Sequence, residues 1–157
     1  MDIRIRKMTE NDPDSLHDLL SDEEVMRYIE APYSREKTES FLCSAGLADD
    51  PLIYAAEADG EFIGYCIFHP FDEKSMEIGW ILKRSAWGKG YACRLTELML
   101  RRCRDLSKDA VIECDPEQET TRHIAEKYGF TYTGEEELSE YRLSVSDIDT
   151  CRNRENK

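Results

Sequence analysis

A strand, a glycine turn and a helix that follow one another along the chain constrain the fold most strongly. The apolar run 76–82 is typical of a strand, and the apolar residues of 91–106 recur every three or four positions, as on the core face of a helix. Between them lies Trp87-Gly88-Lys89-Gly90-Tyr91-Ala92, where two glycines permit a sharp turn. The run Asp109–Cys114 predicts a further strand, which a right-handed crossover makes parallel to the first.

The same turn predicts an anion site. A helix N-terminus presents unpaired N–H groups and the positive end of the helix dipole, which together favour phosphate. Residues 81–104 carry seven basic side chains and one acid, Glu97, in a chain whose net charge is −13. This basic island indicates one anionic ligand. A solvent-exposed loop followed by a basic helix face explains the same residues, and the pattern alone does not choose between the two.

The length of 157 residues predicts one domain, which we expect over 1–145, followed by a polar tail over 146–157. No apolar run approaches the ~18–20 residues needed to span a bilayer, and the N-terminus lacks a signal-like apolar segment. We therefore expect a cytoplasmic protein with no membrane partner. The acidic net charge argues against nucleic-acid binding, which needs a basic face. The six cysteines form no CxxC pair, which predicts buried free thiols and no metal site.

The remaining patterns predict a strand, helices and then a three-strand meander before the glycine turn. Alternation over 3–8 indicates the first strand, and helices are expected from Pro13, after Ser21 and after Ser34. Asp59-Gly60 is a strong hairpin signal between two strands. After residue 114 we expect a helix over 119–128, capped by Gly129, and a final strand pair over 130–133 and 138–145.

Four short motifs occur in a fixed order along almost the whole chain. They cover residues 5–12, residues 21–28, Glu77-Ile78-Gly79-Trp80 with the glycine turn, and Glu126-Lys127-Tyr128-Gly129-Phe130. Together with the element order they resemble the GNAT superfamily of N-acetyltransferases, in particular its ribosomal-protein N-terminal acetyltransferase branch. The resemblance implies an α/β (α+β) fold: a mixed, mostly antiparallel sheet of six to seven strands, a splayed parallel central pair and about four helices.

The resemblance further implies acetyl-CoA as donor and a primary amine as acceptor, either a protein N-terminus or a small molecule. Backbone N–H groups of the turn would hold the pyrophosphate, and the strand before it would pair with the pantetheine arm. Residues Gln118, Thr121 and Lys127, around the last helix, would complete the donor site. The cofactor-binding residues implied are Ile81, Leu82, Lys83, Trp87, Gly88, Lys89, Gly90, Tyr91, Ala92, Gln118, Thr121 and Lys127.

For catalysis, Glu77 is the first candidate for the base and Glu113 the second, while Tyr128 is a candidate acid, with Tyr141 also available. The family commonly has Tyr where this chain has Ala125, and Arg or Gln where it has Ser85. These departures leave open an alternative function, a non-catalytic CoA-binding sensor or interaction module on the same fold. A second copy of the chain, forming a homodimer, is a further candidate partner.

Overall fold

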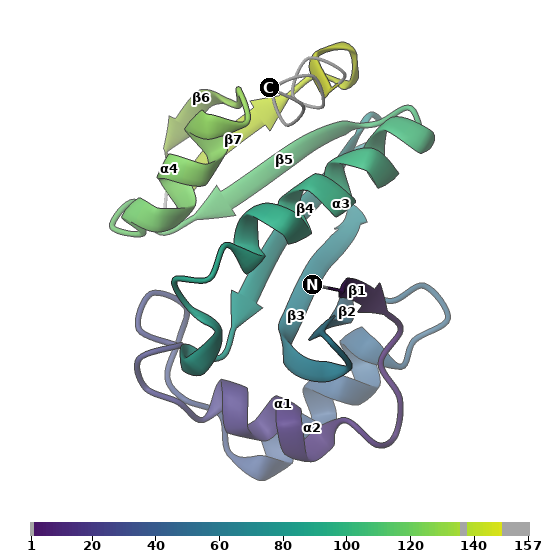
Figure 1. Cartoon of the computed structure of the whole chain (residues 1–157), viewed down its shortest axis with the longest axis vertical. Helices are drawn as coiled ribbons and strands as arrows, with labels where there is room; N and C mark the ends of the chain where they lie inside the picture. Colours follow the sequence, from purple (N-terminus) through teal and green to yellow (C-terminus); the bar gives the residue numbers. More distant parts are fainter. Residues whose placement is uncertain (1, 136–137, 149–157) are drawn as a thin grey trace. The chain divides into compact units, whose positions relative to one another are not determined.

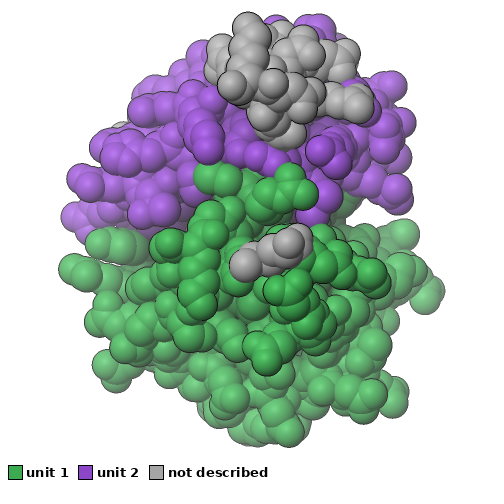
Figure 2. Space-filling model, in the orientation of Figure 1, with its two compact units in different colours: residues 1–69, 80–95 green, residues 70–79, 96–157 purple. Residues whose placement is uncertain are grey.

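The computed structural model describes residues 2–135 and 138–148 (Figure 1). The strands lie in the hydrogen-bonded order β1-β2-β3-β4-β5-β7-β6, and only β4 and β5 of the printed pairs are parallel. This mixed seven-stranded sheet confirms the predicted fold class. The chain divides into two compact units, residues 1–69 with 80–95 and residues 70–79 with 96–157 (Figure 2). The predicted division into one domain and a tail stays a prediction.

The first unit contains three antiparallel strands with two helices packed on them. Strand β1 (Ile3–Arg6) pairs with β2 (Ile53–Ala58), which pairs with β3 (Glu61–Pro70). At the β2–β3 turn Asp59 and Gly60 have φ angles of 51° and 84°. Two positive φ angles in a two-residue loop are typical of a type I′ turn, so the predicted hairpin is confirmed.

Helices α1 (Pro13–Leu20) and α2 (Arg35–Phe41) begin where the sequence predicts. Pro13 occupies the first turn of α1, and the Ser34 hydroxyl caps α2 by accepting the Lys37 N–H at 3.1 Å. A π-helical turn, Leu42–Gly46, continues α2. The apolar sides of these helices and of the three strands form one core of buried side chains, among them Leu16, Leu19, Leu20, Met26, Leu42, Ala55 and Tyr65.

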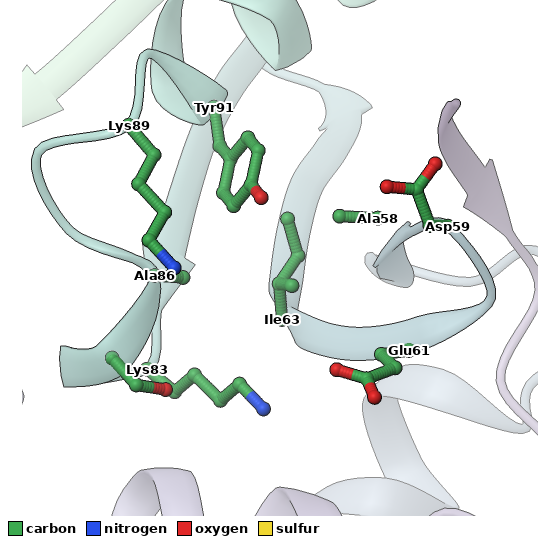
Figure 3. A pocket seen from close by; sticks show the side chains of 9 residues that line it. Ala58, Asp59, Glu61, Ile63, Lys83, Ala86, Lys89 and Tyr91 are labelled. Atoms are coloured by element: carbon green, nitrogen blue, oxygen red, sulfur yellow. The ribbon is translucent and has the colours of Figure 1, made fainter. Parts of the chain in front are cut away.

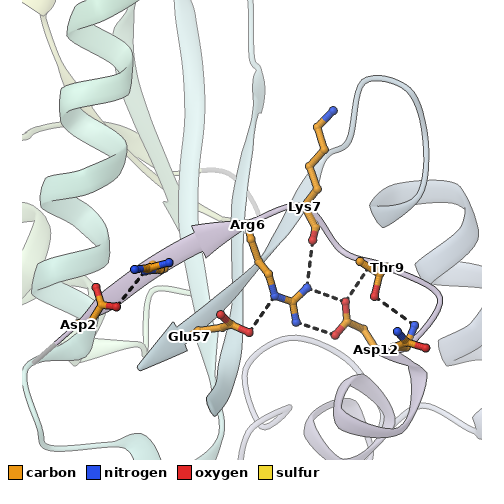
Figure 4. A network of polar contacts seen from close by, with 8 residues as sticks. Asp2, Arg6, Lys7, Thr9, Asp12 and Glu57 are labelled. Atoms are coloured by element: carbon orange, nitrogen blue, oxygen red, sulfur yellow. Dashed lines mark hydrogen bonds and ion pairs between the residues drawn. The ribbon is translucent and has the colours of Figure 1, made fainter. Parts of the chain in front are cut away.

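The entry to α1 is tied to the sheet by Arg6 (Figure 4). Its guanidinium donates to both carboxylate oxygens of Asp12, at 2.8 and 2.9 Å, and to Glu57 of β2 at 2.8 Å. Asp12 is buried, and these hydrogen bonds hold the pKa of its carboxyl below the usual value. A buried charge is tolerated when it is paired in this way. The network therefore joins β1, β2 and the start of α1.

The helix predicted after Ser21 is wrong. Residues 23–29 form a series of turns, in which Val25 and Met26 are buried but Ile29 is 40% exposed. The Asp22 carboxylate accepts the Glu24 N–H at 2.9 Å, as an N-cap does. The N–H groups of Arg27 and Ile29 then donate to carbonyls three residues earlier, at 3.5 and 2.9 Å, so the segment continues as turns.

The second unit is built around the parallel pair. Strand β4 (Ser75–Leu82), which begins in this unit, pairs with β5 (Asp109–Cys114) over three residues only. Strand β7 (Ser139–Leu143) pairs with β5 and with β6 (Thr131–Glu135). Helix α3 (Tyr91–Asp105) runs from the first unit into the second. Its predicted core residues Leu95, Met99 and Cys103 are buried, whereas Leu106 is exposed because the helix has already ended.

Helix α4 (Glu119–Lys127) ends as predicted at a glycine. Gly129 has a φ of 85°, and the Phe130 N–H donates to the Ala125 carbonyl at 2.9 Å, which satisfies the helix end. Strand β7 stops at Leu143, two residues earlier than predicted, and residues 145–148 form a helical turn in which Ile148 is buried. The rest of the predicted tail lies outside the described residues.

Burial of free thiols is confirmed for Cys66, Cys103 and Cys114, but Cys43 is exposed and Cys93 is half-buried. Cys151 lies outside the described residues. Within the part of the chain that the structure describes, we find no helix with the length and hydrophobicity that crossing a membrane requires.

Candidate active site

The glycine turn adopts the conformation that the two glycines predict. Gly88 and Gly90 have φ angles of 73° and 82°, which L side chains rarely adopt. A Cβ atom built on either glycine would meet no other atom within 4 Å. Glycine is therefore required here by backbone conformation and not by crowding within the protein. The space above the turn is open, as a ligand held by backbone N–H groups requires.

Several hydrogen bonds fix the turn against the end of β4. A short 3-10 helix, Arg84–Ala86, leads into it. The indole N–H of Trp87 donates to the Leu82 carbonyl at 2.9 Å, and the Arg94 N–H donates to the Gly90 carbonyl at 3.2 Å as α3 begins. Arg84 forms an ion pair with Asp22, which is 62 residues earlier in the chain. The turn is thus anchored on both sides while its glycines stay open.

The end of β4 offers fewer backbone groups to a ligand than predicted. The Lys83 N–H donates to the Ile63 carbonyl of β3 at 2.8 Å. Alternate residues of a strand direct their N–H and C=O groups to opposite edges. The backbone N–H and C=O groups of Ile81 and Lys83 are therefore directed to β3, and those of Leu82 to the other edge. The Leu82 carbonyl already accepts the Trp87 indole N–H. Of these three predicted residues, Leu82 is therefore the one whose N–H is directed away from β3.

In the second unit the parallel ladder opens immediately after Glu77. The paired residues are Ser75 with Asp109, Met76 with Ala110 and Glu77 with Val111, although both strands continue beyond them. This opening confirms the predicted splayed pair. Residues paired across strands point to the same face, as do residues two apart along one strand. Glu77 and Glu113 therefore share one face, with at least about 8 Å between their Cβ atoms.

We call this face, with Glu77, Glu113, Glu140 and Arg142, the carboxylate face. Val111 pairs with Arg142, and Glu113 pairs with Glu140, so the register brings β7 into it. The Arg142 guanidinium donates to Glu140 at 3.0 Å and to Asp72 at 3.1 Å. Hydrogen bonds from Thr133 and then Arg142 lower the pKa of Glu140. Glu140 therefore stays ionised and is held by these partners. Glu77 and Glu113 stay the predicted candidates for the base.

The two candidate tyrosines are both buried. The Tyr128 hydroxyl donates to Glu97 of α3 at 2.7 Å, so its proton is already engaged. Tyr141 pairs with Ile112, and this register turns it to the face opposite Glu77 and Glu113. Burial raises the pKa of Tyr141. A packing role is the simpler interpretation of both side chains.

The other predicted donor residues lie around α4. The Gln118 side-chain carbonyl accepts the Asp115 N–H at 3.2 Å, so it shapes the helix entry and keeps its amide N–H groups as donors. Thr121 is half-buried in the first turns of α4. Lys127 is exposed, with its ammonium 5.4 Å from the centroid of the Tyr128 ring.

Comparison with known proteins decides the family. The family model described as an acetyltransferase (GNAT) domain matches residues 2–131 of the chain. The chain belongs to the GNAT acetyltransferase family. The resemblance proposed from the motifs is therefore confirmed, and the protein is an acetyl-CoA-dependent acyltransferase with acetyl-CoA as its co-substrate.

One relative and two solved GNAT structures illustrate the similarity. The uncharacterized protein YkkB of Bacillus subtilis is 29% identical over 143 residues, which cover 83% of each chain. Spermidine N-acetyltransferase of Vibrio cholerae, in complex with CoA and spermine, has a TM-score of 0.78 and 20% identity, covering 93% of this chain and 97% of that one. RimL, a ribosomal L7/L12 alpha-N-protein acetyltransferase in complex with coenzyme A, has a TM-score of 0.79 and 19% identity, covering 92% and 95%. At these identities the two structures show the shared fold alone.

The GNAT donor fits the turn chemically. Two glycines in the left-handed region, with open space above them, at the start of a fifteen-residue helix suit a pyrophosphate held by backbone N–H groups. Among the residues that the structure describes, no group of three or more His, Cys, Asp or Glu side chains could hold a metal ion.

Three contacts around the site were missed by the sequence reasoning. They are the Trp87–Leu82 hydrogen bond, the Arg84–Asp22 ion pair and the Tyr128–Glu97 hydrogen bond. The last two join residues 62 and 31 positions apart. No local pattern marks such pairs, because each partner alone looks like an ordinary polar side chain.

Proposed function

We propose that the chain transfers acetyl from acetyl-CoA to a primary amine by direct attack, with Glu77 as the general base. The observation that carries the proposal is the position of Glu77, the last β4 residue of the parallel ladder, on the same face as Glu113. A carboxylate beside the opening of the ladder can accept the proton that the attacking amine loses. Leu82 and the glycine turn would hold the donor.

The acceptor class follows from the cost of making the amine neutral. An aliphatic ammonium has a pKa near ~10.4, so deprotonation at pH 7 costs about 4–5 kcal/mol. A protein N-terminus, with a pKa of ~7.7–8.0, costs only about 1–1.4 kcal/mol. Two carboxylates on one face favour the aliphatic acceptor, because one can act as base while Glu113 binds a second ammonium. We therefore propose a small aliphatic polyamine as the acceptor, and a protein N-terminus as the second candidate.

Thiol release from acetyl-CoA tests this proposal, measured with spermidine, with a monoamine and with a peptide that has a free N-terminus. Mass spectrometry of each product shows whether an acetyl group has been transferred. We expect the highest kcat/KM with the polyamine, and a preference for the peptide would favour the second candidate. Tight acetyl-CoA binding without thiol release for any of these amines would overturn the amine acceptor.

A further inference from the structure

A cavity of about 360 Å³ lies entirely within the first unit (Figure 3). Its walls come from the β2–β3 hairpin, from the connection between β4 and α3, and from the start of α3. None of the lining residues comes from β5 or α4. The volume lies at the lower end of the range of small-molecule sites in proteins, about 300–1,000 Å³.

The cavity is on the β3 side of β4. Ile63 of β3 lines it together with Lys83, whose N–H donates to the Ile63 carbonyl. The strand edge proposed for the pantetheine arm is the opposite one, where the Leu82 N–H is directed. The cavity and that edge are therefore different places, although Lys89 and Tyr91 of the glycine turn line the cavity as well.

The cavity combines an apolar surface with three separate charges. Ile63, Ala86 and Tyr91 line it and are buried. The charges belong to Lys83, Lys89 and Glu61, which Figure 3 shows at its margins. Among the described residues, none of these three charged groups has an ion-pair or hydrogen-bond partner.

The remaining acid of the lining is already engaged. Asp59 accepts the Asp2 N–H at 2.8 Å, so its carboxylate has a partner within the chain. Asp59 keeps its negative charge, but Lys83, Lys89 and Glu61 are the charged groups of the lining that no partner among the described residues engages, so two ammonium groups and one carboxylate are left to bind a ligand. The complementary ligand has two anionic groups, one cationic group and a short apolar body.

We propose that this cavity binds a small amino dicarboxylate, with its carboxylates on Lys83 and Lys89 and its ammonium on Glu61. Carboxylate–ammonium pairs give both charge neutralisation and hydrogen bonds. The short methylene chain of such a ligand lies against Ile63, Ala86 and Tyr91. An inorganic anion pairs with the two lysines but leaves Glu61 unpaired. A diamine pairs with Glu61 but leaves both lysines unpaired. Both therefore bind more weakly than an amino dicarboxylate.

Occupation of the cavity weakens acetyl-CoA binding. The ligand brings a net negative charge beside the glycine turn and pairs with Lys89, which lowers the positive potential available to the pyrophosphate. By thermodynamic linkage, acetyl-CoA weakens the ligand by the same factor. We expect a factor of about five or more, at the lower end of measured allosteric couplings. This effect rests on the donor position given under Proposed function, whereas binding in the cavity does not.

Isothermal titration of the full chain with L-glutamate and with L-aspartate, without acetyl-CoA, tests the site. Glutarate lacks the ammonium group and inorganic phosphate lacks both it and the carbon chain, so each should bind at least about tenfold more weakly. Lys83→Gln and Glu61→Gln should each weaken the amino dicarboxylate by about tenfold. Lys7→Gln is the matched control, because Lys7 is an exposed lysine of the same unit outside the cavity.

The outcomes separate this proposal from the proposed function. No binding of either amino dicarboxylate, equal binding of glutarate, or equal effects of Lys83→Gln and Lys7→Gln would overturn the cavity site. Acetylation of the amino dicarboxylate would also overturn it, since the amine would then occupy the acceptor position. Binding that is lost in Lys83→Gln and Glu61→Gln supports the site, even if acetyl transfer to the proposed polyamine fails.

Discussion

The glycine turn of the first unit and the carboxylate face of the second are built in opposite ways. The turn is one continuous stretch, and the anion site proposed for it depends on two backbone conformations and hardly on side chains. The carboxylate face takes its side chains from β4, β5 and β7, and their common direction depends on the pairing register. A binding surface made of backbone can thus be encoded locally, whereas an arrangement of side chains needs correct strand pairing.

The glycine turn and the carboxylate face also differ in charge. The turn lies in the basic stretch 81–104, where a fixed positive potential suits a phosphate. On the carboxylate face, Arg142 offsets part of the negative charge by pairing with Glu140 and Asp72. In the function we propose, the turn would select by charge and shape together, and the carboxylate face would supply a few specific groups for proton transfer and cation binding.

The largest effect is expected from Glu77→Gln. If Glu77 is the base, kcat with an aliphatic amine should fall about 10²–10⁴-fold, because the amide cannot accept the proton. Steady-state rates across pH measure this loss, which should shrink at high pH, where more of the amine is already neutral.

The matched control for that variant is Glu113→Gln on the same face. We expect it to raise KM for a polyamine more than it lowers kcat. The reverse result, a large fall in kcat for Glu113→Gln and none for Glu77→Gln, would exchange the two roles.

The next largest effect should come from the turn. Gly88→Ala and Gly90→Ala force a Cβ atom into the left-handed region, at a cost of roughly 1–2 kcal/mol each. The backbone relaxes away from the pyrophosphate geometry, so we expect the Kd for acetyl-CoA to rise about tenfold. Calorimetric titration gives this Kd.

Gly60→Ala provides the matched control for the turn. Gly60 also has a positive φ, 84°, and a Cβ built on it would meet no atom within 4 Å. It should lose similar stability without losing acetyl-CoA affinity. Equal losses of affinity in all three variants would mean that general destabilisation, and not the turn itself, explains the result.

An effect on stability, and not on acetyl-CoA affinity, is expected from Tyr128→Phe. This variant removes a buried hydrogen bond to the Glu97 carboxylate, which should lower the free energy of unfolding by about 1.5–3 kcal/mol. Urea unfolding measures this change. If Tyr128 only packs, kcat for the folded variant stays within about twofold of the parent value, and a fall of about 10²-fold or more would restore its candidacy as the acid.

The smallest effect is expected from Arg142→Gln, whose side chain is partly exposed, with a loss of less than about 1 kcal/mol at pH 7. The folded-state pKa of Glu140 lies below its ordinary value, first through Thr133 and then through Arg142. Its stabilising contribution is therefore present above the unfolded pKa and is lost as pH falls through the folded one. Urea unfolding at pH 7 and at pH 3 should show a smaller acid-dependent loss in the variant than in the parent, and an unchanged loss would contradict the role of Arg142.

The sequence by itself determined the features whose causes are local. Gly88 and Gly90 determine the turn, Asp59-Gly60 the hairpin and Gly129 the end of α4, because each requires a backbone conformation that few other residues adopt. The spacing of apolar residues predicted α3 and β5, because this spacing is also a local property of the sequence. The conformation of the turn proposed to hold the donor was therefore predictable from a short stretch.

Only the tertiary structure decided the features that depend on distant partners. Asp22 bonds the Glu24 N–H and pairs with Arg84, and turns replace the helix that apolar spacing predicts after Ser21. The Tyr128 hydroxyl donates to Glu97, and the common face of Glu77 and Glu113 came from the strand register. A pairing register and a contact between distant residues depend on how the whole chain packs. A local sequence pattern therefore predicts neither of them.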